Sequence, residues 1–214
     1  MRQVPRPSVD ERRREILEAT CKVVIERGFA NTRISDVAHE LDVSSGLIHY
    51  HFESKGALFA EALRFASESD LARLASTVAE GDTAAEKLER IFQLYSPSES
   101  EPGWLLWIDS WGEAMRSREL RDISQELDLA WKHTIEKIIV EGVASGEFHC
   151  DDPNAAAWRL TALLDGLGVQ LTVHEGVVSR AEMIDWVREA AAKELGLASS
   201  ATAGSGSRRA RRAG

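Results

Sequence analysis

The stretch from Thr32 to Lys55 constrains the fold of this chain more than any other part of the sequence. Its first half carries apolar residues at the i, i+3, i+4, i+7 spacing of one buried helix face, namely Ile34, Val37, Ala38 and Leu41. Thr32 is the expected N-cap of this helix, and Ser44 is the expected N-cap of a second short helix at residues 45–52. Two short helices joined by a tight turn form a helix-turn-helix, so the sequence predicts this motif near the N-terminus.

The second of these helices has an unusual outer surface for an element that faces solvent. Ile48 and Phe52 are expected to face inward, and the other positions carry small or hydrogen-bonding side chains together with one leucine: Ser45, Gly46, Leu47, His49, Tyr50 and His51. No acidic residue occurs in this helix before Glu53, and Lys55 follows shortly after. Hydroxyl, imidazole and ammonium groups can donate hydrogen bonds to phosphates, whereas a carboxylate repels them. This surface is therefore suited to a DNA groove.

The segment GFANTRISDVAHELDVSSGLIHYHFESKGAL, residues 28–58, resembles the DNA-binding domain of the TetR (tetracycline repressor) family, whose usual pattern is close to GFxxTTxxxIAxxxGVSxGTLYYHFxSKxxL. The matching positions include Gly28, Phe29, Thr32, Val37, Ala38, Val43, Ser44, Gly46, Tyr50, His51, Phe52, Ser54, Lys55 and Leu58. The rest of the chain resembles the family only in its length and in its expected helical layout.

Two residues in this segment depart from the family pattern. Asp42 stands at the turn where Gly is usual, and Asp adopts the left-handed backbone conformation more readily than most residues. Leu47 replaces a common Thr, so an apolar contact with a thymine methyl group becomes available where the family often contacts a phosphate.

The resemblance implies a homodimeric transcription regulator, most simply a repressor, whose two helices at residues 45–52 enter successive major grooves of a roughly palindromic operator. The grooves would lie about 34–36 Å apart. The implied base-reading residues are Ser45, Gly46 and His49. The implied phosphate contacts are Thr32, Arg33, Ser44, Tyr50, His51 and Lys55.

The distribution of charge restricts the DNA-binding surface to one part of the chain. The net charge is −9, and residues 1–56 contain nine basic and nine acidic residues, whereas residues 57–206 contain 13 basic and 26 acidic residues. An acidic protein of this kind is not a general nucleic-acid binder, so the DNA contacts must form a localised patch.

Other features of the sequence exclude several classes of protein. No apolar run approaches the about 20 residues of a membrane span, and the N-terminus lacks the apolar stretch of a signal peptide, so we expect a cytoplasmic protein without membrane association. The two cysteines, Cys21 and Cys150, indicate neither a disulfide framework nor a zinc site. No constellation of nucleophile and base and no set of metal ligands is evident, so we expect no enzymatic activity, metal or cofactor. A DNA-independent adaptor or an architectural protein remains possible, as does a DNA-binding protein without small-molecule induction.

Apolar periodicity predicts an all-α fold. The resemblance implies that this fold consists of an N-terminal three-helix DNA-binding domain and a C-terminal helical ligand-binding and dimerisation domain. The expected domain organisation is a flexible arm at residues 1–9, a helix-turn-helix domain at residues 10–56, a helical domain at residues 57–197 and a disordered basic tail at residues 198–214. The break at residues 96–103, which contains two prolines and three serines, is expected to be a loop.

An aromatic stripe marks a candidate ligand pocket in the helical domain. Trp104, Trp107, Ile108, Trp111 and Met115 lie within a narrow arc of one expected helix. Such a stripe suits a pocket wall and a hydrophobic core about equally. If it is a pocket, its expected residues are Phe92, Tyr95, Trp107, Trp111, Met115, Trp131, Ile135 and Asp165.

The effector expected for such a pocket is a flat hydrophobic compound, with a cationic ligand held by cation–π contacts as the alternative. Asp165 could contact a ligand, or it could serve the structure through hydrogen bonds within the protein.

The helix expected at residues 154–175 is apolar on two opposite faces, which predicts burial on both sides. The resemblance implies that this helix and the last helix pair with their copies in a four-helix dimer interface. The expected interface residues are Leu160, Leu164, Leu167, Leu171, Trp186 and Val187.

Overall fold

The computed structural model describes residues 8–97, 103–174 and 176–197, and within these residues the chain forms helices and no strands. The helices are α1 (Val9–Arg27), α2 (Ile34–Glu40), α3 (Ser45–His51), α4 (Lys55–Ala79), α5 (Ala84–Tyr95), α6 (Gly103–Ala114), α7 (Arg118–Ser145), α8 (Pro153–Val173) and α9 (Arg180–Glu194). The predicted all-α fold is confirmed. The tail predicted at residues 198–214 and most of the predicted N-terminal arm and proline-containing loop lie outside the described residues.

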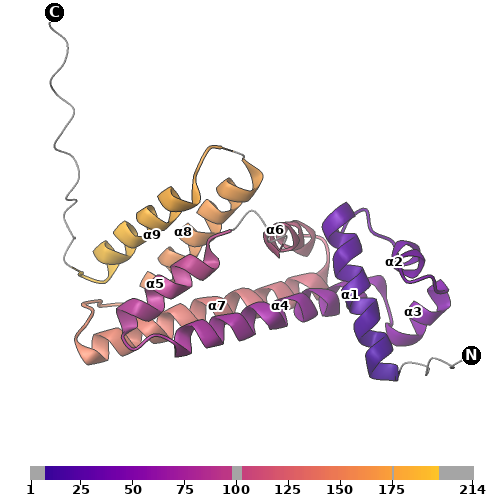
Figure 1. The fold of residues 1–214 in the computed structure, drawn as a ribbon, viewed down its shortest axis with the longest axis horizontal. Coiled ribbons are helices and arrows are strands. Elements are labelled where there is room, and N and C mark those ends of the chain that lie inside the picture. The colour runs from indigo at the N-terminus through magenta and orange to yellow at the C-terminus, as the bar shows by residue number, and fades with distance from the viewer. Residues whose placement is uncertain (1–7, 98–102, 175, 198–214) are drawn as a thin grey trace, which may run out of the picture.

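The three N-terminal helices lie at one end of an elongated molecule, and α8 and α9 lie toward the other end (Figure 1). The long helices α4 and α7 run side by side between these two ends. Of the helices in the described ranges, none is long and apolar enough to cross a membrane. Because α4 begins four residues after the end of α3, any movement of α4 is transmitted directly to the helix-turn-helix.

The helix-turn-helix forms as the sequence predicts, with one change at its first cap. Ser44 caps α3, since its hydroxyl accepts a hydrogen bond from the Leu47 N–H (3.4 Å). Asp42 adopts a left-handed conformation (φ 52°), which confirms the role expected for it at the turn. Thr32 is not the N-cap of α2, because that position is Arg33, whose N–H donates to the carboxylate of Asp36 (2.8 Å).

Two hydrophobic clusters stabilise the molecule. The first joins α1, α2 and α3 to the beginning of α4, to α6 and to the first half of α7. The second is formed by the end of α4 together with α5, α8, α9 and the second half of α7. Since α4 and α7 contribute to both clusters, they connect the two ends of the molecule rigidly. The domain boundary at residue 56 stays a prediction.

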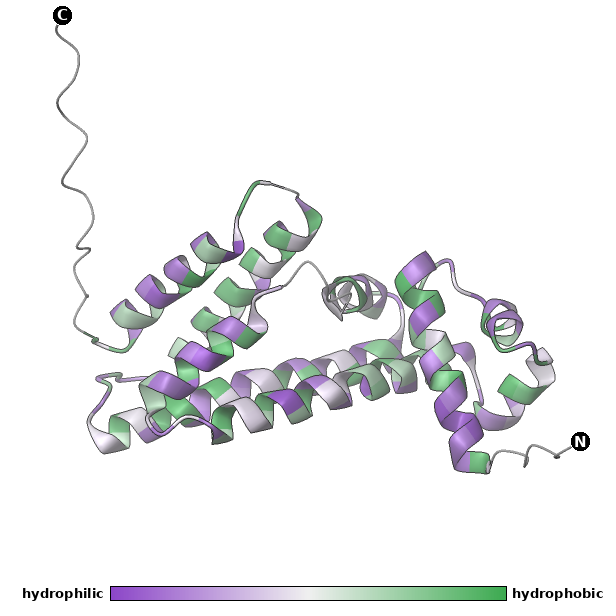
Figure 2. Ribbon diagram, viewed as in Figure 1, coloured by the Kyte–Doolittle hydropathy of each residue, from purple (hydrophilic) through white to green (hydrophobic). Residues whose placement is uncertain are grey.

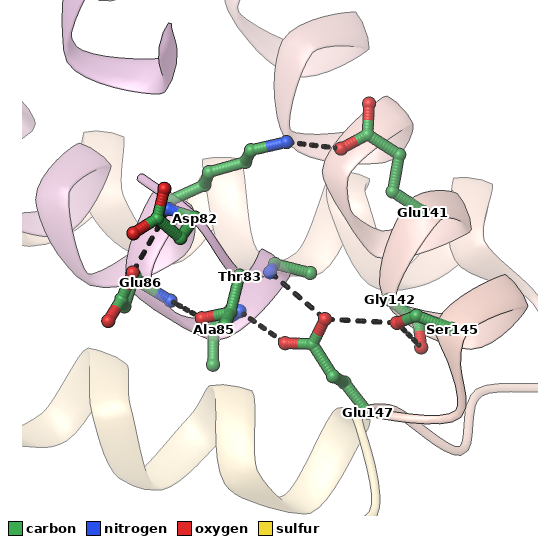
Figure 3. Close-up of polar contacts among 10 residues, drawn as sticks. Asp82, Thr83, Ala85, Glu86, Glu141, Gly142, Ser145 and Glu147 are labelled. Carbon is green, nitrogen blue, oxygen red and sulfur yellow. Dashed lines mark hydrogen bonds and ion pairs between the residues drawn. The ribbon is translucent and has the colours of Figure 1, made fainter. Parts of the chain in front are cut away.

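The N-terminus of α5 is attached to the end of α7 by Glu147. The Glu147 carboxylate accepts hydrogen bonds from the N–H groups of Ala84 (3.2 Å) and Ala85 (3.1 Å), and Lys87 forms an ion pair with Glu141 (2.7 Å; Figure 3). These backbone hydrogen bonds hold the pKa of Glu147 below its usual value. A carboxylate at a helix N-terminus is favourable, so this contact fixes the helix that carries Tyr95.

The helix α8 is hydrophobic over much of its length (Figure 2), and part of the leucine face predicted to pair with a second subunit packs instead on the subunit's own core. Leu160 and Leu164 are almost fully buried within the subunit, as is Val187 of α9, so their assignment to a dimer interface is wrong. The outward face carries Trp158, which is 50% exposed. An apolar pattern on both faces could not show which face packs on the subunit's own core.

Candidate functional site

The outer surface of α3 and its flanking residues is exposed as the sequence predicts. Gly46, His49 and Tyr50 face solvent, and Tyr50 is 76% exposed. Arg33, Ser44 and Lys55 are also exposed, while Ser45 and His51 are partly buried. Neither α3 nor α4 has an acidic residue in its first turn. This surface therefore presents hydrogen-bond donors and no carboxylate along α3.

Thr32 cannot contact a phosphate in this conformation. Its side chain is fully buried, and its hydroxyl donates a hydrogen bond to the carbonyl oxygen of Gly28 (2.8 Å). The predicted phosphate contact of Thr32 is therefore wrong, because this threonine stabilises the corner between α1 and α2.

Arg13 of α1 holds the C-terminal end of α3 in place, a role that the sequence did not indicate. Its guanidinium donates to the carbonyl oxygen of His51 (2.6 Å), forms an ion pair with Glu61 of α4 and lies 4.3 Å from the centre of the Phe52 ring. Three helices are thereby fixed around one side chain, which sets the orientation of α3.

A pocket with a volume of about 250 Å³ lies between α4, α5, α6 and α7. Five aromatic side chains line it, namely Tyr95, Trp104, Trp107, Trp111 and Trp131. The remaining lining residues include Asp70, Arg73 and Asp128. Asp70 and Arg73 lie on α4, so the wall of the pocket includes the helix that begins just after α3.

The aromatic rings of the pocket meet at steep angles. The Tyr95 ring packs edge to face with Trp104 (centroids 5.5 Å apart) and Trp131 (5.0 Å), and Trp104 packs in the same way with Trp111 (6.4 Å). The polar edge of Trp104 is bonded to the protein, because its indole N–H donates to the Tyr95 carbonyl oxygen (3.2 Å). These three ring pairs meet at 67°, 85° and 80° and form adjoining walls of a box, and the face of such a ring attracts a cation.

Asp128 of α7 adds a carboxylate to this aromatic wall. Both of its oxygens accept a hydrogen bond from the Trp111 indole N–H (3.3 and 3.2 Å). Burial raises the pKa of Asp128 from 3.8 to about 6, with a further contribution from nearby Asp165, although the hydrogen bond from Trp111 lowers it. Burial is the main cause of this elevated pKa, so the ionised form of Asp128 is poorly solvated at its place in the pocket wall.

Asp165 lies behind the aromatic wall rather than in it. It accepts a hydrogen bond from the hydroxyl of Tyr95, and burial raises its pKa while this hydrogen bond lowers it. Burial likewise raises the pKa of Tyr95 well above its ordinary value, with a further contribution from Asp165, so the phenol stays protonated and donates.

Four of the residues predicted for the pocket line it: Tyr95, Trp107, Trp111 and Trp131. Phe92 and Ile135 belong instead to the hydrophobic core of the second cluster, and Met115 is 70% exposed, so these three assignments are wrong. Asp128 was missed, although it precedes Trp131 by three residues and therefore shares its side of α7.

A second contact connects the pocket helix α6 to the helix-turn-helix. The backbone N–H of Phe29, just after α1, donates a hydrogen bond to the Asp109 carboxylate. Asp109 thus points away from the aromatic stripe and binds the corner that holds Thr32. Both α4 and α6 therefore lie between the pocket and α3.

Comparison with known proteins gives matches along most of the chain. Residues 16–62 match the family described as bacterial regulatory proteins, tetR family, and residues 84–196 match the BetI-type transcriptional repressor C-terminal family. The HTH-type transcriptional regulator BetI of Paraburkholderia xenovorans is 26% identical over 165 residues, which are 73% of this chain and 79% of that protein.

Solved structures of other regulators have the same fold. A transcriptional regulator from Saccharomonospora viridis in complex with choline superposes with a TM-score of 0.77 and 33% identity over 84% of this chain and 95% of that one. A TetR-family regulator from Rhodococcus sp. gives a TM-score of 0.73 and 29% identity over 87% and 99% of the two chains. With its helix-turn-helix, its helical C-terminal part and these matches, this chain belongs to the TetR family of transcriptional regulators.

Proposed function

We propose that this protein is a homodimeric repressor that binds a palindromic operator through α3 and leaves it when a small quaternary ammonium compound occupies the aromatic pocket. The observation that carries the proposal is the box of aromatic rings with the carboxylate of Asp128 in its wall. A cation in this box would gain cation–π contacts and an ionic partner in the same site.

The size and charge of the pocket favour a small cation over a flat hydrophobic compound. A volume of about 250 Å³ is below the about 300–1,000 Å³ typical of pockets for drug-sized ligands. A neutral ligand would shield the partly buried Asp128 carboxylate from water without supplying a positive charge, which disfavours its binding. A cationic ligand, the alternative effector expected from the sequence, is therefore favoured over a flat hydrophobic compound.

Choline is the first compound to test. The regulator from Saccharomonospora viridis that shares 33% identity with this chain was solved in complex with choline, and the C-terminal match is to BetI-type repressors. The decisive experiment is calorimetric titration of the protein with choline and with its uncharged analogue, in which a tert-butyl group replaces the trimethylammonium group. We expect binding of choline and at least tenfold weaker binding of the tert-butyl analogue; equal affinities would exclude recognition of the charge.

Release from DNA follows from thermodynamic linkage. Suppose that the ligand binds more tightly to a conformer in which the spacing of the two α3 helices does not match the operator. The ligand must then lower the affinity for DNA by the same factor by which DNA lowers the affinity for the ligand. The contacts that could carry this coupling are Asp70 and Arg73 in the pocket wall on α4, and Asp109 on α6. Addition of choline to a complex with an operator selected from random duplexes should release the protein. If the complex survives saturating choline, the protein is a DNA-binding regulator without this induction.

For the DNA surface, we propose that Ser45, Gly46 and His49 contact bases and that Arg33, Ser44, Tyr50, His51 and Lys55 contact phosphates. Their support is their position on or beside α3, a helix that itself contains no acidic residue. Lys55 at the first residue of α4 is placed unfavourably for the helix dipole, which a nearby phosphate would compensate.

Lys55→Ala should weaken binding to all DNA sequences and lower the slope of log affinity against log salt by about 1, because one phosphate contact is lost. Fluorescence anisotropy at several salt concentrations measures this slope. Lys137→Ala on the exposed side of α7 is the matched control and should leave the slope unchanged. His49→Ala should instead change the base preference in a selection from random duplexes, and an unchanged preference would remove His49 from the base-reading set.

The affinity for choline should depend on pH through Asp128. The ionised carboxylate binds the cation and the quaternary ammonium group does not titrate, so protons and choline compete for the site. With a pKa of about 6 in the free protein, affinity should be constant above about pH 7 and should fall as the pH decreases through 6, by up to about tenfold per pH unit. Titrations between pH 5 and 8 measure this dependence, and a flat profile would mean that Asp128 does not contact the cation.

A further inference from the structure

We infer that α8 sets the ligand selectivity of the pocket from behind, through Asp165 and Gly168, although neither residue is part of the pocket lining. This inference rests on the proposed cation-binding function. It states that two residues of α8 position two of the aromatic side chains that line the pocket. Asp165 holds Tyr95 and Gly168 makes room for Trp104.

Asp165 holds the ring of Tyr95, which contacts two of the tryptophans that line the box. Tyr95 donates its hydroxyl to Asp165, while its ring packs edge to face with both Trp104 and Trp131. A rotation of this phenol would change two contacts between walls at once. Because the phenol is buried and its hydroxyl is bonded to a carboxylate, such a rotation would leave two buried polar groups without partners.

Asp165 also contributes charge. It raises the pKa of Asp128, so the two carboxylates are close enough to interact electrostatically. Charged groups facing Asp128 come from other elements as well, because Asp70 and Arg73 of α4 line the same pocket. A cation in the box would therefore experience the field of Asp165 through the Tyr95 wall in addition to that of Asp128.

Gly168 is the position at which α8 touches the Trp104 ring. A Cβ atom at residue 168 would lie within 2.7 Å of Cη2, Cζ3 and Cζ2 of Trp104, whereas Cβ atoms in proteins essentially never approach other atoms closer than 3.0 Å. Any side chain at this position must displace the indole, whose contacts with Tyr95 and Trp111 form two corners of the box. In a pocket of only about 250 Å³, a displaced indole changes the size of ligand that fits.

Two other residues provide matched controls. Gly112 of α6 is also a helical glycine, but a Cβ there would meet nothing within 4 Å. Thr161 lies one turn before Asp165 on α8, and its buried hydroxyl has no hydrogen-bond partner within the described residues. Thr161→Val removes a polar group from the same region of α8 without removing a hydrogen bond, so it should leave ligand binding intact.

The test is calorimetric titration of wild type, Gly168→Ala, Asp165→Asn, Gly112→Ala and Thr161→Val with choline and with tetramethylammonium, a smaller cation. Gly168→Ala should weaken choline at least tenfold and tetramethylammonium less, which changes the ratio of the two affinities. Asp165→Asn retains a hydrogen-bond acceptor for Tyr95 and should weaken both cations severalfold. Because the charge of Asp165 raises the pKa of Asp128, Asp165→Asn should also shift the pH midpoint of cation binding below that of wild type. A variant whose structure was merely loosened would not show this shift.

The outcomes separate this inference from the function on which it rests. If wild type binds neither cation, the proposed function fails and the inference fails with it. If wild type binds both, but Gly168→Ala keeps the wild-type ratio of affinities and Asp165→Asn keeps the wild-type pH midpoint, only the inference is overturned. Retained DNA binding by Gly168→Ala shows that the variant is folded. If it does not fold, Asp165→Asn decides alone, because this near-isosteric change introduces no steric clash.

Discussion

Asp128→Asn should weaken choline binding by about 10- to 100-fold, the loss expected when a partly buried ionic partner is replaced by a neutral group. Asparagine has nearly the same shape, and its carbonyl oxygen can still accept the hydrogen bond that Trp111 donates to Asp128. The aromatic walls should therefore stay in place. Calorimetric titration with choline and with the tert-butyl analogue measures the effect, and the affinity for the uncharged analogue should stay the same or increase.

The same variant should be more stable than wild type in the absence of ligand. The pKa of Asp128 rises from 3.8 to about 6 on folding, so the stabilisation from its protonated form is fully present below about pH 4 and is lost as the pH increases through 6. At pH 7 the ionised carboxylate destabilises the fold, and its removal should raise the Tm measured by thermal unfolding. A variant with lower Tm and unchanged choline affinity would assign Asp128 a structural role.

Trp158→Asp should convert a dimer into a monomer and lower the affinity for a palindromic operator by about 100- to 10,000-fold, because two linked half-site contacts become independent. Trp158 is 50% exposed on the outward face of α8, and Trp186 of α9 is 43% exposed. Exposed tryptophans on adjacent helices are typical of a surface that is buried in an assembly. We therefore propose that this face, and not the leucine face, pairs with its copy.

Analytical ultracentrifugation and gel-shift titration measure the two expected effects of Trp158→Asp. The carboxylate introduced at residue 158 would lie near Lys132, whose ammonium group is 5.3 Å from the Trp158 ring centre. The fold of the subunit should therefore tolerate the change. Val140→Asp on α7 replaces another exposed apolar residue, 49% exposed, and is the matched control that should stay dimeric. A wild-type protein that is monomeric at micromolar concentration, or a Trp158→Asp variant that still dimerises, would contradict the proposed interface.

The ligand pocket illustrates where prediction from sequence succeeds and fails. The aromatic residues Tyr95, Trp107, Trp111 and Trp131 could be assigned because large rings at helical spacing have to be buried together. Phe92 and Ile135 are also large apolar residues at helical spacing, and only the packing of α5 and α7 with α8 and α9 directs them into the core. Asp128 was not assigned to the pocket, since a single carboxylate in a long amphipathic helix usually faces solvent.

Local interactions along the chain determined the helices, the cap at Ser44, the left-handed turn at Asp42 and the carboxylate-free surface of α3, because periodicity, capping and turn conformation depend on residues close in sequence. Tertiary structure alone decided which face of α8 packs inside the subunit. It also decided that Asp128 joins the aromatic wall and that Asp165 and Gly168 stand behind it. These features depend on how helices distant in sequence pack against one another, and the pattern of a single helix carries no information about its neighbours.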